Sequence, residues 1–181
     1  MWLDLAIDLF TPTGREKPIE ERVAAATDAD TLGVELQGQG SFKRRLNASG
    51  WLADEVVAAG SLRQGKPPSM LSMLTGAALV EVLKPRRSKS LPREIALAVT
   101  TDRVVAFAMS AWSEGDEFTD YVVKIKRGEL GSWPLGSARL SDRADAAGWK
   151  GGMLQLGDLD PFPVTWNGDP SSDELVELIS R

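Results

Sequence analysis

Apolar and polar residues alternate most regularly between residues 91 and 110, and this pattern predicts a β-hairpin. Small alanines separate the large apolar residues of the first strand, which is the period-two pattern of a strand with one face in a core. Residues 100–102 (Thr-Thr-Asp) are expected to form the turn, because aspartate tolerates turn geometry and bonds back to the backbone. The core-facing positions are Ile95, Leu97 and Val99 in the first strand and Val105, Phe107 and Met109 in the return strand.

Shorter strands are expected on both sides of this hairpin. One covers residues 54–60 and is ended by Gly60. The later ones, separated by glycines at the spacing of an all-β barrel or sandwich, cover residues 121–126, 138–140, 153–156 and 162–166. A terminal helix follows, because residues 171–174 (Ser-Ser-Asp-Glu) match a capping box. Its apolar stripe consists of Leu175, Leu178 and Ile179.

Three helices are predicted in the first half of the chain. The first covers residues 18–29, and the second covers residues 41–51, capped by Ser41. The exposed side of the second helix carries Lys43, Arg44 and Arg45. The third helix covers residues 69–83 and is apolar nearly all round. A helix of this kind has to be buried against its own domain, another subunit or a membrane surface.

The strand at residues 54–60, the hairpin with its Thr101-Asp102-Arg103 sequence, the later short strands and the terminal helix together resemble a bacterial PH-like domain. The resemblance implies an α+β, mainly β fold: seven strands in a partly open β-barrel, with a C-terminal helix that plugs one end. It covers about residues 41–181. The run of residues 67–94 is also similar to an uncharacterised actinobacterial family, and that similarity assigns no activity.

Two segments lie outside the PH-like pattern. A helical insertion at about residues 62–92 stands where such a domain usually has a short loop. Residues 1–40 are expected to be an acidic N-terminal extension with a short helix, since they hold eight acidic and three basic side chains. The remaining residues hold eighteen of each. A nucleic-acid partner is therefore not expected, because phosphate binding needs a basic face.

The chain contains neither cysteine nor histidine. This excludes disulfides, thiolate nucleophiles, Ser-His-Asp triads and zinc sites built on Cys or His. Only carboxylate or lysine chemistry and oxygen-ligated Mg²⁺ or Ca²⁺ remain, so we expect a protein that is not an enzyme and has no cofactor. The N-terminus has no basic leader, and no apolar run approaches the ~20 residues that cross a bilayer, so a cytoplasmic location is expected.

The insertion carries the main candidate binding residues. Its basic run consists of Lys84, Arg86, Arg87, Lys89 and Arg93. These cations could bind an anionic lipid surface or an acidic partner, or they could be solvated and pair with the acidic residues 1–40. The candidate partner surface of the preceding helix consists of Met70, Met73, Leu74 and Leu79. This surface could pack on the chain's own barrel, on a second copy or on another protein.

Two other motifs are weaker. Residues 60–66 match the G-x-x-x-x-G-K spacing of a phosphate-binding loop, but Pro67 stands where that motif needs a hydroxyl for Mg²⁺. Acidic clusters at residues 116–120 and 158–160 lack the spacing of a calcium loop, and they lie in predicted turns, where aspartate is common. We predict no metal or catalytic site from either motif.

The sequence therefore predicts a non-catalytic interaction module that binds a protein partner or an anionic membrane surface, with a homo-oligomer as one form of partner. The alternative is a binder of a small anionic ligand that uses the basic run at residues 84–93. An enzyme that uses carboxylates or lysine is the third interpretation.

Overall fold

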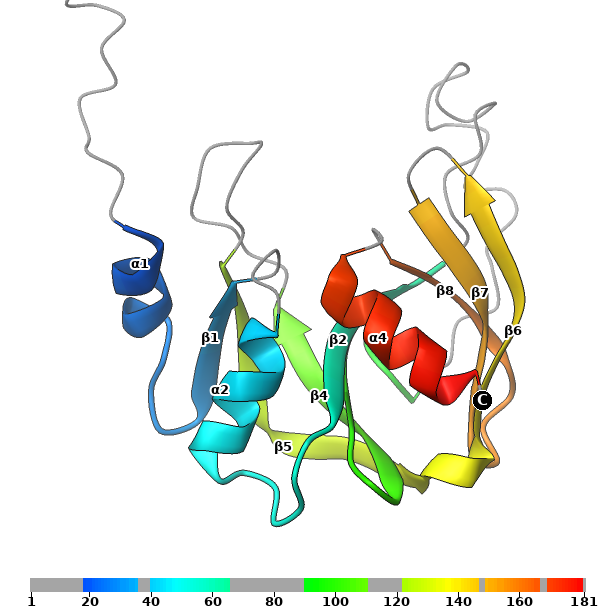
Figure 1. Ribbon diagram of the computed structural model, residues 1–181, viewed down its shortest axis with the longest axis horizontal. Helices are drawn as coiled ribbons and strands as arrows, with labels where there is room; N and C mark the ends of the chain where they lie inside the picture. The colour runs from blue at the N-terminus through cyan, green and yellow to red at the C-terminus, as the bar shows by residue number, and fades with distance from the viewer. Residues whose placement is uncertain are drawn as a thin grey trace, which may run out of the picture.

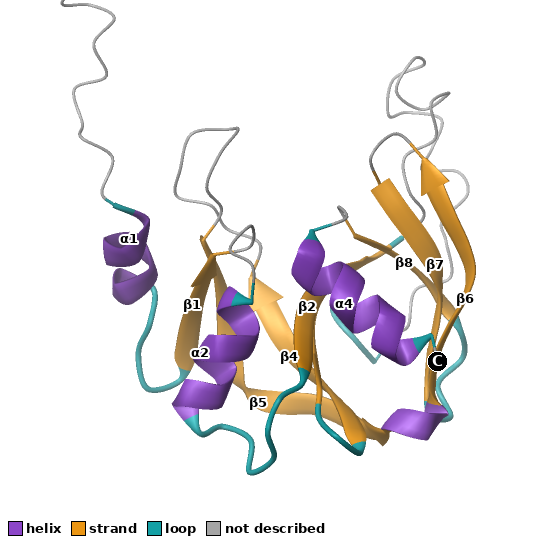
Figure 2. Cartoon of the chain, viewed as in Figure 1, coloured by secondary structure: helices purple, strands orange, loops and turns teal. Residues whose placement is uncertain are grey.

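A computed structural model describes residues 18–35, 40–65, 90–110, 122–146, 149–166 and 169–180 (Figure 1). In these residues eight strands form one antiparallel sheet of order β1-β5-β4-β3-β2-β8-β7-β6 (Figure 2). The strands are β1 (Thr31–Glu35), β2 (Ala58–Gln64), β3 (Glu94–Val99), β4 (Arg103–Ser110), β5 (Val122–Pro134), β6 (Ala138–Ala146), β7 (Trp149–Leu156) and β8 (Phe162–Trp166). The helices are α1 (Ile19–Ala25), α2 (Ser41–Ser49) and α4 (Pro170–Ile179), with a 3₁₀ turn η2 at Leu135–Ser137. The α+β, mainly β class is confirmed, and the described sheet is not closed.

The predicted hairpin is confirmed as β3 and β4, which pair antiparallel with Val99 opposite Val104. At the turn, the backbone N–H of Thr100 donates to the Arg103 carbonyl over 2.9 Å. The Asp102 carboxylate accepts from the Thr100 hydroxyl over 2.9 Å, so it bonds a side chain rather than the backbone. The turn is thus fixed by residues that are adjacent in the sequence, and such a turn can be predicted from a local pattern.

The expectation that β3 has one buried face was too limited, because β3 is buried on both faces. Every residue from 95 to 99 is 0% exposed. Ile95, Leu97 and Val99 pack in one core cluster with α4 and β6–β8. Ala96 and Ala98 pack in a second cluster with α2, β1 and β5. Figure 1 shows α2 and α4 on either side of β2, so the centre of the sheet separates two cores.

The predicted strand at residues 54–60 begins later and ends later than expected. β2 starts at Ala58 and continues to Gln64. The segment before it is held by Asn47, whose side-chain oxygen accepts from the Val56 N–H over 2.8 Å and whose amide donates to the Val56 carbonyl over 3.1 Å. A side chain of α2 thus occupies the backbone groups that a strand partner would need.

The later strands are confirmed in number and order, but most are longer than predicted. β8 has the predicted bounds, whereas β5 has 13 residues and pairs with both β1 and β4. β5 can bend between these partners because Gly128 has a φ of 110° and the register with β4 shifts near Phe107.

Both helix caps differ from the prediction. Asp169, not a Ser171 capping box, caps α4: its carboxylate accepts from the Ser172 N–H over 2.9 Å, and Pro170 occupies the first helical position. Gly40, not Ser41, precedes α2, with a left-handed φ of 69°. The predicted stripe of α4 is buried at Leu175 and Ile179.

Part of the expected N-terminal extension belongs to the sheet. β1 pairs with β5 along its whole length, and its Leu32 and Val34 are buried in the cluster with Phe42. Alternation over five residues is too short to identify such a strand among glycines and acidic residues. The described part of the chain contains no helix of the length and hydropathy needed to cross a membrane.

Candidate functional site

The predicted insertion leaves the sheet and returns to it at one narrow point. We call this point the neck and define it by Gln64 at the end of β2 and residues 91–93 before β3. The Gln64 amide donates both of its protons, to the Leu91 carbonyl over 2.9 Å and to the Pro92 carbonyl over 2.8 Å. The Gln64 backbone N–H donates to the Arg93 carbonyl over 2.7 Å. Three hydrogen bonds from one residue therefore hold the two ends together.

Gln64 can serve this purpose because it is buried, with 2% of its surface exposed. A buried amide that loses its partners is costly, on the order of 1–3 kcal/mol for each unsatisfied group. Next to Gln64 on the protein surface, the Arg63 guanidinium lies 3.9 Å from the Glu94 carboxylate. The geometry at both ends of residues 65–90 is thus fixed by the sheet and by Gln64.

Of the predicted basic residues, only Arg93 lies in the described part of the chain, where it is exposed at the neck. The other four, Lys84, Arg86, Arg87 and Lys89, lie outside the described residues. The same is true of the predicted partner surface, Met70, Met73, Leu74 and Leu79.

Sequence reasoning missed Gln64. One signal was available: on the alternation that makes Ala58 and Leu62 core-facing, position 64 also faces the core. A glutamine there needs buried hydrogen-bond partners, and only the tertiary structure shows that these are the carbonyls on the other side of the insertion.

The described part of the G-x-x-x-x-G-K sequence, residues 60–65, does not form a phosphate-binding loop. Residues 60–64 lie in β2, and the pairs Gly60–Leu97 and Leu62–Ile95 place them in the ladder with β3. A strand of this kind uses its backbone N–H groups for sheet pairing, whereas a phosphate loop directs them toward the ligand.

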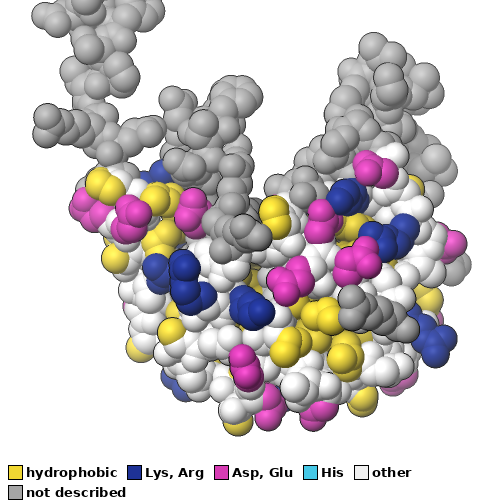
Figure 3. Space-filling view, in the orientation of Figure 1, with side chains coloured by type: hydrophobic (Ala, Val, Ile, Leu, Met, Phe, Trp, Pro, Cys, Tyr) yellow, Lys and Arg dark blue, Asp and Glu magenta, His cyan; other side chains and the backbone are white. Residues whose placement is uncertain are grey.

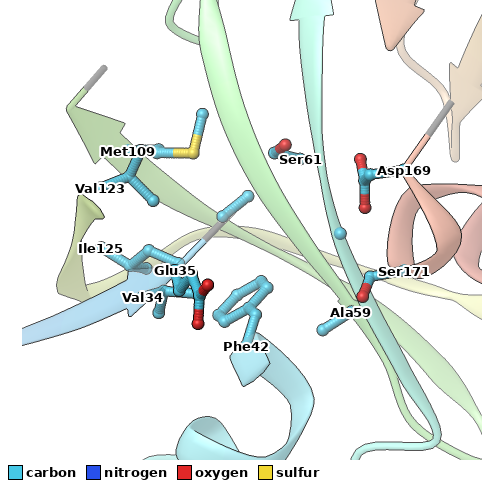
Figure 4. A pocket seen from close by; sticks show the side chains of 12 residues that line it. Val34, Glu35, Phe42, Ala59, Ser61, Met109, Val123, Ile125, Asp169 and Ser171 are labelled. Carbon is cyan, nitrogen blue, oxygen red and sulfur yellow. The ribbon is translucent and has the colours of Figure 1, made fainter. Parts of the chain in front are cut away.

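A hollow lies between α2, β1 and the start of α4 (Figure 4). Val34 and Phe42 supply part of its apolar wall, and Figure 4 shows Glu35 and Asp169 on opposite sides of it. It encloses only about 20 Å³, room for about one water molecule. Ligand pockets are commonly about 300–1,000 Å³, so the geometry of this hollow suits packing better than small-molecule binding.

A second depression, of about 250 Å³ and open to solvent, lies between β6, β7 and β8 beside α4. Its cations already have partners on α4: Lys150 lies 2.7 Å from Asp173, and Arg143 lies 2.9 Å from Glu177. Figure 3 shows acidic and basic side chains next to one another on this side of the molecule. An anion here would have to compete with two carboxylates that belong to the chain itself.

The surroundings of the Asp173 carboxylate shift its pKa. Burial alone would raise its pKa, but the hydrogen bonds from Lys150 and Trp166, together with the charges of Lys150 and Arg143, outweigh burial and lower the pKa below its usual value. The Trp166 indole N–H donates to the carboxylate over 2.8 Å. A carboxylate held ionised in this way suits a structural ion pair and not a general acid at neutral pH.

The hairpin arginine and one of the two acidic clusters lie in the described part of the chain. Arg103, at the hairpin turn, lies 3.3 Å from Asp54 and 3.5 Å from Glu129. Asp158 and Asp160 lie in the exposed β7–β8 turn, and the cluster at residues 116–120 lies outside the described residues. Within the described ranges, no group of three or more acidic residues is arranged to hold a metal ion.

Neither a protein-family model nor a curated protein sequence matches this chain.

Proposed function

We propose that this chain is a non-catalytic interaction module with a PH-like domain, and that it presents the segment between β2 and β3 to an anionic membrane surface. The neck carries this proposal, because three hydrogen bonds from Gln64 fix the point from which the segment leaves the sheet. A basic run in the sequence between two fixed ends can meet a negatively charged surface on the side of the molecule where the neck lies. Each basic group near such a membrane contributes about 1 kcal/mol.

The PH-like part of the proposal is supported by the order of the strands. After residue 41, the strands β2 to β5 lie side by side in chain order as one antiparallel group, and β6 to β8 form a second group. β2 pairs with β8 and so joins the two groups. α4 follows the last strand and packs its buried face on the core shared by both groups. β1 is an addition to this arrangement.

The non-catalytic part is supported by the use that the fold makes of its charged groups. Asp169 caps a helix, Asp173 binds Trp166 and Lys150, and Arg103 links Asp54 to Glu129. These contacts join helices, strands and turns of the scaffold. A carboxylate or lysine engaged in this way is not available for proton transfer to a substrate.

Sedimentation with anionic vesicles tests the proposal. Lys84, Arg86, Arg87 and Lys89 are changed to Ala in one variant, and in another a short Gly-Ser linker replaces residues 66–89. We expect both variants to lose most of the binding seen for the wild type at low salt, because the first removes four basic groups and the second removes the same four and Lys66, at about 1 kcal/mol each. The linker variant should keep its fold, because the neck and the β2–β3 pairing remain.

The matched control removes four exposed cations elsewhere: Arg44, Lys124, Lys126 and Arg127 to Ala. This control should sediment nearly as the wild type does. Equal loss in the control would mean that only total charge matters, and equal binding by all proteins would contradict the proposal.

If inorganic phosphate at constant ionic strength displaces the vesicles, a small-anion site is the better description. If vesicles do not bind at all, a protein partner remains as the occupant of the same segment.

A further inference from the structure

β1 is an edge strand of the sheet, and α1 covers its outer side. Among the described strands, β1 pairs with β5 along one edge and has no strand on the other. On the other edge, the Thr27 hydroxyl accepts from the Gly33 N–H over 3.0 Å, and the Asp28 N–H donates to the Thr31 carbonyl over 2.9 Å. The end of α1 and the following turn therefore occupy backbone groups that a further strand would use.

α1 packs against the backbone of β1 at Gly33. A Cβ built on Gly33 would lie 2.4 Å from the Val23 carbonyl oxygen and 2.8 Å from the Ala26 Cβ, so no larger residue fits beneath the helix. The Thr27 hydroxyl in turn donates to the Val23 carbonyl over 2.8 Å. Helix, threonine and strand edge thus form one small contact.

This contact is held by little apolar surface. α1 has seven residues and no side-chain cap at its N-terminus, and Val23 is its only buried residue. An isolated helix shorter than about 12–15 residues is marginal in water, so α1 depends on docking to remain helical. α2 buries two apolar residues and α4 buries three, so α1 is the described helix with the weakest apolar anchor.

The strand beneath α1 can pair with itself. An antiparallel pair of two β1 strands centred on Gly33 places Thr31 opposite Glu35 and Leu32 opposite Val34. No like charges face each other in this register, and the two apolar residues of each strand meet their counterparts. Gly33 meets Gly33 at the two-fold axis, so no side chains crowd the centre.

We propose that α1 is a displaceable cover on the edge of β1, and that its release lets β1 of one copy pair antiparallel with β1 of a second copy. The two sheets then continue across the interface through main-chain hydrogen bonds, which is the usual form of strand addition. This contact is separate from the segment between β2 and β3, so it can be tested without membranes.

The test uses Val23→Asp in the full chain, with Ala24→Asp as its matched control, since residue 24 is exposed on the same helix. Hydrogen exchange of the Gly33 amide reports release of α1 when it is measured without the cysteines and at a concentration that keeps the chain monomeric, because the proposed pairing would itself protect this amide. The chain has no cysteine, so Thr31→Cys and Glu35→Cys can be introduced into separate samples of each background. When the two samples are mixed and oxidised, residues 31 and 35 of opposite copies lie about 5.5 Å apart between Cα atoms in the proposed register, within disulfide range.

In the Val23→Asp background, we expect Gly33 to exchange at least ~10-fold faster, which is about 1.4 kcal/mol of lost protection. We also expect the mixed disulfide dimer to exceed clearly the half of all dimers that random pairing of equal samples gives. The Ala24→Asp background should behave as the wild type. Unchanged Gly33 exchange would contradict the role of α1 as a cover. Fast exchange with no more mixed dimer than random pairing gives would contradict the pairing of the two β1 strands. If Val23→Asp lowers global stability, Thr27→Val releases the Gly33 amide without changing the buried valine.

Discussion

At the scale of single residues, the described structure depends on polar side chains that join distant parts of the chain. Asp173 of α4 binds Trp166 of β8 and Lys150 of β7 with one carboxylate. Gln64 joins the end of β2 to the chain just before β3. The sequence predicts neither contact, because the partners of Gln64 lie 27 and 28 residues away, and no local pattern links Asp173 to Lys150.

The lowered pKa of Asp173 predicts an acid-dependent contribution to stability. A group whose pKa is lowered by folding stabilises the fold above its unfolded value of about 3.9, and this contribution is lost as the pH falls through the folded pKa. We expect Asp173→Asn to lower the free energy of unfolding by about 1–3 kcal/mol at pH 7 and by progressively less below pH 4.

Urea unfolding at a series of pH values measures this difference. Glu174→Gln is the control, since its carboxylate is 54% exposed and 3.9 Å from Lys43, and it should change the stability little. A difference between wild type and Asp173→Asn that stays constant from pH 7 to pH 3 would contradict the assignment.

At the scale of elements, the first turn of α4 packs directly on the backbone of β2. The Ser172 hydroxyl donates to the Ser61 carbonyl and accepts from the Ser61 N–H, each over 3.1 Å. A Cβ built on Gly60 would lie 2.7 Å from the Ser172 Cα. The terminal helix itself was predictable from its stripe, whereas the reason for Gly60 is a contact 112 positions later in the chain.

Gly60→Ala should therefore separate α4 from β2. The conflict is with helix backbone, which cannot yield as a flexible side chain would, so we expect a loss of about 1–3 kcal/mol in the free energy of unfolding. Gly136→Ala is the matched control, because a Cβ at Gly136 meets nothing within 4 Å. Chemical denaturation of both variants measures the effect, and equal stabilities would show that α4 tolerates the displacement.

At the scale of the whole molecule, the centre of the sheet separates two cores. One core lies under α4 and the strands β6–β8, and the other lies under α2 with β1 and β5. β3 contributes large residues to the first core and alanines to the second. Sequence reasoning named the large residues of both strands, but it did not show that Val105 and Phe107 pack with the alanines of β3 in a core of their own. Alanines between large residues look the same in a strand whose other face is solvated.

Hydrogen exchange in the native state should reflect this arrangement. Amides of residues 95–99 and 104–107 lie between both cores and should open only in global unfolding. Amides of α1 should exchange through local opening at much lower cost, because Val23 is its only buried residue. Exchange measured by mass spectrometry at several denaturant concentrations distinguishes the two classes. Similar protection in α1 and β3 would contradict both the two-core arrangement and the weak docking of α1.

The sequence by itself determined the features that depend on near neighbours. The β3–β4 hairpin, the bounds of β8 and the apolar stripe of α4 follow from spacings of two or three to four residues and from adjacent turn residues. The absence of histidine and cysteine likewise limits the chemistry open to the chain, because this limit depends on composition alone.

Only the tertiary structure decided which residues meet across long separations. It placed β1 in the sheet, extended β2 to Gln64, closed the neck over Leu91 and Pro92, and buried the second face of β3 under α2. The physical reason is the same in each case. A buried hydrogen bond or an apolar contact stabilises the fold only when both partners are present, and the second partner lies beyond the range of any local pattern.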